Sequence, residues 1–296
     1  MDWLLRKISP SEALTRATSE TLDHKTTMTQ PVEQTEAPAT VIEFAVQLQS
    51  QKDVDDVTKT LNDLGISVSE VDQKSQKVVV TTSLPSTRVH AAIANTGRQA
   101  VVRGCSAPEG ANLGTAVCMI LGEKGTSEDM GAVKSSATAQ DASAASEPVG
   151  MVRGLVRFVQ VSEDVCVVDG AASGLQTGTH GVRVNTYGDL TDGCSSTEPV
   201  YTDKVSGEAI GNLGDVEADT HGHTSFKFVA RNLRVWDIIG RAVVIDSSSL
   251  KDTQEENKGS VACGLIARSA GVGENIKKVC ACSGKTLWEE GADEYY

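Results

Sequence analysis

Aromatic residues, histidines and long apolar runs are scarce in this sequence, and each shortage excludes a class of protein. Only 4% of the 296 residues are aromatic, 5 are histidine, and the formal net charge is −13. Lysine and arginine never gather into the basic clusters that phosphate binding needs, which argues against a nucleic-acid partner. No stretch approaches the roughly 20 apolar residues that span a bilayer, so no integral membrane segment is expected. An acidic protein with room for two domains remains.

The first residues and the cysteine count bear on the compartment. No long apolar core follows Met1, so a secretory signal is not expected, and Glu12 and Glu20 disfavour a transit peptide. We predict a disordered leader over residues 1–39 and a cytoplasmic protein, with room for a minor mitochondrial pool. The chain has 7 cysteines, and an odd number without a secretory signal does not indicate a disulfide framework.

Residues 40–106 carry the pattern of a small α+β domain. Apolar residues alternate in its strand segments and recur at helical spacing between them. The order βαββαβ predicts a ferredoxin-like domain. Strand, helix, strand, strand, helix and strand are expected at about 41–48, 53–64, 65–72, 76–84, 85–97 and 98–104.

Residues 112–274 have a different texture, in which short apolar strands alternate with glycine-rich turns and no helical pattern intervenes. This spacing predicts an all-β antiparallel sandwich or barrel. Residues 122–150 are poor in large apolar side chains and predict a long mobile loop. The strand pattern then ends, and residues 275–296 form a polar tail that contains Cys280 and Cys282.

Six stretches, in this order, resemble the family of copper chaperones for superoxide dismutase: IEFAVQ, TGRQAV, HGVRVNTYGDLT, VWDIIGRAVVI, ACGLIARSAG and CACSGKTLWEE. The resemblance covers roughly residues 40–291. It implies a ferredoxin-like domain of the heavy-metal-associated type and a second domain with the Greek-key sandwich or barrel of copper/zinc superoxide dismutase. It also implies a Cys-X-Cys tail. The implied partner is an immature copper/zinc superoxide dismutase monomer, bound as a heterodimer through a face that also permits a homodimer.

The first domain departs from the family pattern at its metal loop. Family members commonly carry Met-X-Cys-X-X-Cys after the first strand, where two thiolates at a helix N-terminus hold Cu(I). Here Ser50 and Asp53 occupy the cysteine positions, and neither offers a soft sulfur ligand. We therefore expect this domain to bind no copper and to be structural or a recruitment surface.

The second domain departs from the dismutase pattern at its metal ligands. The resemblance places histidine or aspartate ligands at six positions where this sequence has other residues. Copper and zinc sites need several nitrogen, oxygen or sulfur donors, so we predict no zinc site, no catalytic residues and no dismutase activity. The segments that would correspond to the zinc-bearing and substrate-guiding loops are also short. The positions are Arg183, Asn185, Val200 and Asp246 for copper, and Ala209 and Asn212 for zinc.

Cys280 and Cys282 are the candidate metal ligands. Side chains two apart in an extended segment lie on the same side, so two thiolates can share one Cu(I). The same pair can instead close a strained disulfide that exchanges with a partner thiol. Alone, a Cys-X-Cys in a tail is more often incidental. Because SGKTLWEE follows it here, as in the family, we interpret it as the site of transient Cu(I) binding.

The other cysteines have simpler interpretations. The resemblance implies a disulfide between Cys194 and Cys263, although two reduced buried thiols are the ordinary alternative in the cytosol. A loop of that length, if closed without strain, stabilises the fold by about 4 kcal/mol. Cys118 and Cys166 lie in apolar strands and are predicted to be small buried hydrophobes. Cys105 lies at the domain junction, where an exposed thiol is one interpretation.

Histidines contribute no convincing metal site. His221 and His223 flank a glycine, so a solvated hairpin turn is favoured over chelation. The resemblance makes His180 a structural, hydrogen-bonding residue rather than a ligand.

The resemblance also implies a partner-binding face built from strand ends, with glycines that permit close backbone approach and apolar neighbours that supply buried area. Trp288 in the tail is the predicted aromatic anchor on the partner. The predicted face comprises Tyr187, Gly188, Ile239, Gly240, Arg241, Leu265 and Ala267.

These features favour a copper chaperone that docks on an immature dismutase and promotes copper delivery and disulfide formation through its tail. An active dismutase is the enzyme alternative. A scaffold that pairs with the dismutase without transferring copper is a third.

Overall fold

In the computed structural model, the described residues are 37–108, 113–122, 151–252, 259–275 and 288. The chain divides into two units, with the boundary after Thr35. Every described residue belongs to the second unit, Glu36–Tyr296. Most of the predicted leader, loop 122–150 and tail therefore fall outside the described residues, Cys280 and Cys282 included. Within the described part, no helix is long and apolar enough to cross a membrane.

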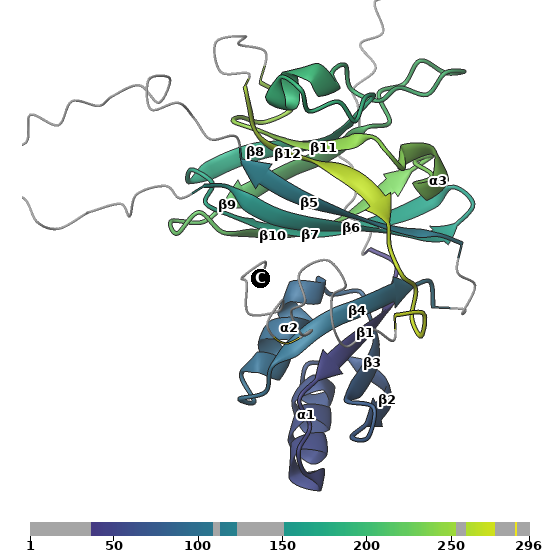
Figure 1. The fold of residues 1–296 in the computed structure, drawn as a ribbon, viewed down its shortest axis with the longest axis vertical. Coiled ribbons are helices and arrows are strands. Elements are labelled where there is room, and N and C mark those ends of the chain that lie inside the picture. Colours follow the sequence, from purple (N-terminus) through teal and green to yellow (C-terminus); the bar gives the residue numbers. More distant parts are fainter. Residues whose placement is uncertain (1–36, 109–112, 123–150, 253–258, 276–287, 289–296) are drawn as a thin grey trace, which may run out of the picture. The chain divides into compact units, whose positions relative to one another are not determined.

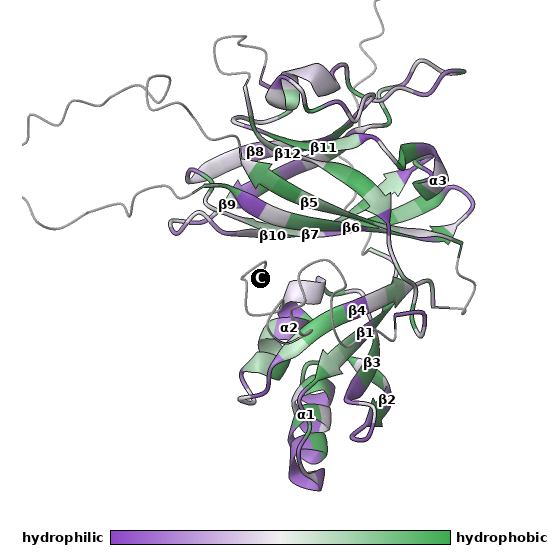
Figure 2. Ribbon diagram, viewed as in Figure 1, coloured by the Kyte–Doolittle hydropathy of each residue, from purple (hydrophilic) through white to green (hydrophobic). Residues whose placement is uncertain are grey.

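The first domain is a four-stranded antiparallel sheet with strand order β2-β3-β1-β4 and two helices, the ferredoxin-like fold predicted from the sequence (Figure 1). Phe44 of β1 and Val57 of α1 are fully buried in the core of this domain. Figure 2 shows α1 with hydrophobic and hydrophilic residues on different sides. The elements are β1 (Thr40–Val46), α1 (Gln51–Asp63), β2 (Ser67–Asp72), β3 (Lys77–Thr82), α2 (Ser86–Ala94) and β4 (Ala100–Ser106).

The second domain is an eight-stranded antiparallel near-barrel, as predicted, with strand order β10-β7-β6-β5-β12-β11-β8-β9. The inward residues of these strands form one core, in which Phe158 and Ile245 are fully buried. The strands are β5 (Thr115–Gly122), β6 (Arg153–Ser162), β7 (Val165–Ser173), β8 (Gly178–Asn185), β9 (Asn212–Ala218), β10 (Thr224–Arg231), β11 (Ala242–Asp246) and β12 (Ser260–Arg268).

Three short elements in this domain were not predicted. Strand β9, NLGDVEA, buries only Val216 and Ala218, so its apolar signal is weak. A four-residue helix α3 (Val235–Ile238) and a 3-10 helix (Gly193–Thr197) are too short to show periodicity.

Buried polar contacts join the two domains. Asp169 on β7 is 5% exposed and accepts hydrogen bonds from the backbone N–H (2.8 Å) and Oγ (3.1 Å) of Ser86, at the start of α2. Lys227 on β10 donates to Thr40 Oγ1, Thr82 O and Leu84 O. Burial raises the pKa of Asp169 and lowers that of Lys227, because each charge is removed from water.

Candidate functional site

The loop after β1, where the resemblance places a metal site, is a helix cap. Ser50 is the N-cap of α1, and its Oγ accepts a hydrogen bond from the Asp53 N–H at 3.3 Å. The Asp53 carboxylate accepts from the N–H groups of Gln49 (2.7 Å) and Ser50 (3.0 Å). The two positions therefore form a capping box, which satisfies donors that a helix start leaves unpaired.

Arg98 lies against this cap. It precedes β4, and its Nη2 lies 2.7 Å from Asp53 Oδ1 and 2.9 Å from Asp56 Oδ2. Arg98 and the backbone donors hold the pKa of Asp53 down at about 2. Sequence reasoning missed Arg98 because 45 positions separate it from Asp53, and no local motif links them.

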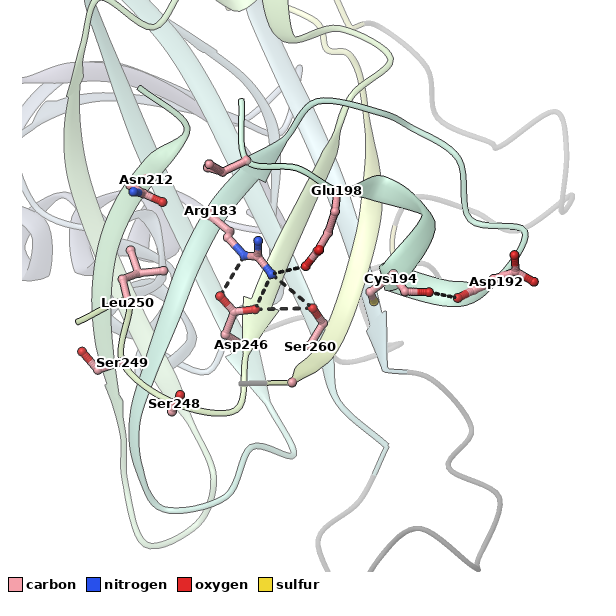
Figure 3. Close-up of a pocket in the computed structure, with 13 residues that line it drawn as sticks. Arg183, Asp192, Cys194, Glu198, Asn212, Asp246, Ser248, Ser249, Leu250 and Ser260 are labelled. Carbon is pink, nitrogen blue, oxygen red and sulfur yellow. Dashed lines mark hydrogen bonds and ion pairs between the residues drawn. The ribbon is translucent and has the colours of Figure 1, made fainter. Parts of the chain in front are cut away.

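In the near-barrel, the position of the expected copper ligands holds an ion pair between adjacent strands (Figure 3). Arg183 on β8 reaches Asp246 at the end of β11 with Nε to Oδ2 at 2.8 Å and Nη2 to Oδ1 at 3.0 Å. This is the two-pronged contact that a guanidinium makes with a carboxylate. Glu198 Oε1 (3.2 Å) and Ser260 Oγ (3.5 Å) also accept from Nη2.

The surroundings shift both partners of this pair. Burial raises the pKa of Asp246, and the hydrogen bond and positive charge of Arg183 offset that shift only in part. Burial opposes the charge of Arg183, but the contacts with Asp246 and Glu198 outweigh it and raise the pKa. The cost of desolvation in this pair therefore falls on the carboxylate.

A cavity of about 460 Å³ opens beside this pair, and Val200 and Asn212 line it too. Asn185 forms a β-bridge with Val200 but does not line the cavity; it is fully buried and donates from Nδ2 to Thr197 Oγ1 at 2.8 Å. Ala209 does not line the cavity. Four of the six expected ligand positions are thus brought together. Across the described residues, no group of three or more His, Cys, Asp or Glu side chains could hold a metal ion.

A disulfide joins Cys194 to Cys263, the pair that the resemblance implies. The Cα atoms lie 5.7 Å apart, and Val244 forms a small buried cluster with the two cysteines. The bond ties the short helix at Gly193–Thr197 to β12, and Cys194 also lines the cavity beside Arg183.

The remaining described cysteines and histidines have structural roles. Cys105, Cys118 and Cys166 are all buried, so Cys105 is not the exposed thiol that its place in the sequence suggested. Burial raises their thiol pKa values to about 11, 12 and 12. The His180 ring bonds the Asp246 and Gln176 carbonyl oxygens at 2.8 and 2.7 Å.

The two glycine-flanking histidines lie in the turn between β9 and β10. The backbone N–H groups of His221 and His223 donate to Asp219 Oδ1 at 2.8 and 2.9 Å. This arrangement is the turn expected from the sequence.

The predicted partner face does come together at the ends of β11 and β12. A Cβ on Gly188 would lie 2.0 Å from Gly240 O and 2.9 Å from Leu265 Cδ2, so this close approach requires glycine. Gly240 itself has φ +81°, a conformation that disfavours other residues. Tyr187 and Leu265 are large exposed side chains here. Arg241 differs, because it bonds the Asp237 and Thr186 carbonyls and stacks on the Tyr201 ring.

Two apolar residues of this region were missed from the sequence. Met119 and Leu121 point outward from β5 and are each 48% exposed. The β12–β5 register places Met119 opposite Leu265 and Leu121 opposite Cys263. Met119, Leu121 and Leu265 form what we term the apolar strip. The signal was present in GTAVCMIL, whose outward positions are unusually apolar for a half-buried strand.

The structure describes two residues of the predicted tail, Asn275 and Trp288. Trp288 lines a pocket formed otherwise by residues of the first domain, including Ala94 of α2 and Val101 of β4. Its predicted role as a partner anchor stays a prediction.

Comparison with known proteins gives consistent matches. The family model for copper/zinc superoxide dismutase matches residues 152–266. The human "Copper chaperone for superoxide dismutase" is 37% identical over 267 residues, covering 84% of this chain and 88% of that protein. The rat protein of the same name is 36% identical over 271 residues, with the same coverage. The "Superoxide dismutase 1 copper chaperone" of Debaryomyces hansenii is 34% identical over 265 residues, covering 85% of this chain and 94% of that protein.

Proposed function

We propose that this chain, which belongs to the family of copper chaperones for superoxide dismutase, docks on an immature copper/zinc superoxide dismutase monomer and delivers Cu(I) to it. Kinship over most of the chain supports the chaperone role and the dismutase partner. The finer steps, namely heterodimer formation, copper transfer and disulfide formation, are proposals. So are the domain limits 40–106 and 112–274 and the cytoplasmic location.

The observation that carries the proposal is the ion pair of Arg183 and Asp246. A guanidinium and its carboxylate partner occupy the position at which a dismutase would bind copper, and they satisfy each other. The chain therefore supplies no redox centre of its own there, and we propose that it has neither dismutase activity nor a zinc site. Copper is then cargo, held by thiolates elsewhere in the chain.

Docking is proposed to use the close-packed glycine corner and the apolar strip. Gly188 packs closely against the Gly240 backbone, and Leu265 and Met119 are exposed apolar side chains. Interfaces of stable complexes combine such an apolar centre with a polar rim. A homodimer through the same face would compete with the heterodimer.

Cys280 and Cys282 are proposed to carry the chemistry. As two thiolates they share Cu(I) and pass it to the ligands of the docked target. When the tail instead holds a Cys280–Cys282 disulfide, a target thiolate attacks one sulfur and a mixed disulfide forms. A second target thiolate resolves it, so the target gains the disulfide and the tail leaves as a dithiol. Trp288 is proposed to anchor the tail on the target during this step.

A scaffold without copper transfer is the second candidate, and one observation favours it. The capping box of Ser50 and Asp53 supplies no thiolate, so the first domain cannot deliver copper as its relatives do. Copper titration of the chain with and without residues 275–296 separates the two functions. A transfer protein loses its Cu(I) site with the tail, whereas a scaffold has none to lose.

Leu265→Arg tests the docking face. Leu265 is 45% exposed, so arginine is tolerated in the monomer, but on the proposed face it buries an unpaired charge. We expect co-elution with copper-free, reduced dismutase to be lost. Val205→Arg, at a 96% exposed position between β8 and β9, is the matched control and should bind normally. Gly240→Arg is a poorer test because its positive φ strains the monomer. Normal co-elution of Leu265→Arg would place the interface elsewhere.

A further inference from the structure

The first domain carries a groove that holds part of the tail. Its volume is about 390 Å³, and one of its lining residues, Trp288, is half-buried there. All the other lining residues belong to the end of α2, the following turn and the start of β4. They are His90, Ala94, Gly97, Arg98, Gln99, Ala100 and Val101.

Contacts within the first domain fix the shape of this groove. The ring of His90 bonds Ala100 O at 2.9 Å, and Arg98 is held by Asp53 and Asp56. The turn is closed by Gly97, which has φ +83° and donates its N–H to Ala94 O at 2.8 Å. These contacts hold the groove's residues in place independently of the tail, and Trp288 lines the groove together with a guanidinium and an imidazole.

The chain also follows the first domain as it leaves the near-barrel. After β12, the Val272 N–H donates to Ser106 Oγ at 2.9 Å and the Gly273 N–H donates to Glu43 Oε2 at 2.6 Å. Asn275 Nδ2 donates to the Arg103 carbonyl at 3.4 Å. Contacts with the first domain thus lie on both sides of the segment that contains the two tail cysteines.

We propose that the first domain, whose loop after β1 has Ser50 and Asp53 in place of cysteines, is a holder for the C-terminal tail, which it binds through Trp288 when no partner is present. Cys280 follows Asn275 by five residues, and Cys282 precedes Trp288 by six. At about 3.4 Å per residue, both thiols stay within roughly 20 Å of an anchor point on this domain, whatever path the chain takes. In this proposal, the first domain does not bind copper itself but positions the cysteines that do.

Trp288 can therefore occupy either the first-domain groove or the proposed site on the dismutase, but not both at once. One indole cannot pack against the first domain and anchor on a dismutase at once, so docking on the target has to detach Trp288 from the first domain. That exchange rests on the function proposed above. The resting contact does not, because it needs neither copper nor a partner.

The test uses the full chain with Trp3→Phe and Trp236→Phe, which leaves Trp288 as the one tryptophan of the three. Acrylamide quenching of its fluorescence is measured without copper or partner. In the native chain we expect quenching about threefold weaker than in denaturant, because the groove shields the ring. Ala94→Glu, which places a charged side chain at the groove, should bring quenching close to the denatured value.

Ala91→Glu is the matched control, since Ala91 is also exposed on α2 but does not line the groove. It should quench as the unmodified chain does. Circular dichroism of both variants confirms that the domain is folded. The proposal is overturned if native Trp288 is as accessible as in denaturant, or if Ala94→Glu and Ala91→Glu quench equally.

Discussion

The two regions where the family resemblance places metal sites each contain an arginine–aspartate pair, but in different surroundings. In the first domain, Arg98 joins Asp53 at a helix start that also offers backbone N–H groups to the carboxylate. In the near-barrel, Arg183 joins Asp246 between two strands beside a cavity. The distances are similar, yet the pKa of Asp53 falls to about 2 whereas that of Asp246 rises.

Similar distances between an arginine and an aspartate therefore do not determine whether the charged form of the carboxylate is favoured. Asp53 accepts hydrogen bonds from Arg98 and from two backbone N–H groups, so its charged form is favoured. Asp246 loses water that one arginine does not fully replace, so its charge is costly even when paired. The first pair supports the start of a helix, and the second joins two strands beside a cavity.

The largest expected effect comes from introducing two cysteines into the loop after β1 of the first domain. Ser50→Cys/Asp53→Cys places two thiols at the N-terminus of α1, where the helix dipole and Arg98 favour thiolate. In a Cys280→Ser/Cys282→Ser background, this chain should retain one Cu(I) against glutathione, measured by copper analysis after gel filtration. The background chain itself should retain none. Ser50→Cys alone is the control, and equal retention by all three chains would refute the interpretation of the loop.

Breaking the second pair should give the next largest effect. Arg183→Met leaves Asp246 without its main partner, and we expect a loss of about 2 kcal/mol in the free energy of unfolding, because the site keeps some solvent contact. Arg183→Met/Asp246→Leu removes both charges and should recover much of that loss. Urea unfolding of the single and double variants measures the difference. If the single variant is as stable as the unmodified chain, the pair is not what holds β8 to β11.

The smallest effect is in the pH dependence of stability, and the two regions should differ in sign. Because the folded pKa of Asp53 is below its ordinary 3.8, its contribution is present above about pH 4 and is lost as pH falls toward 2. Asp246 has a raised folded pKa, so its contribution is greatest below 3.8 and is lost as pH rises through the folded value.

Asp53→Asn and Asp246→Asn, unfolded by urea between pH 2 and pH 6, separate these contributions. Asp53→Asn should flatten the acid-side loss of stability seen in the unmodified chain. Asp246→Asn should remove the opposing trend. Curves that shift in the same direction for both variants would contradict the contrast between the two regions.

Much of the fold followed from the sequence because its strands and helices carry strong periodicity. The βαββαβ order and the antiparallel near-barrel were both predicted, whereas β9 was missed because it buries few apolar residues. At the sites, the sequence showed which residues stand at the expected ligand positions but not which contacts they make. Arg98 reaches Asp53, and Arg183 reaches Asp246, only once distant strands are paired.

The tail shows the same limit. Trp288 was predicted to be an aromatic anchor on a partner. No periodicity or motif could indicate that it lines a groove together with residues of the first domain. Met119 was likewise visible in the sequence, and only the register of β5 with β12 places it beside Leu265.

The central claim, that this chain is a chaperone that acts through its tail thiols, is tested most directly with Cys280→Ser/Cys282→Ser. The variant and the unmodified chain are each incubated with Cu(I) and reduced, copper-free dismutase, and dismutase activity and target disulfide content are then measured. Serine preserves size but removes the soft, ionisable donor, so we predict normal co-elution with the target and no activation. Activation at the level of the unmodified chain would remove the two cysteines from the mechanism and contradict the account.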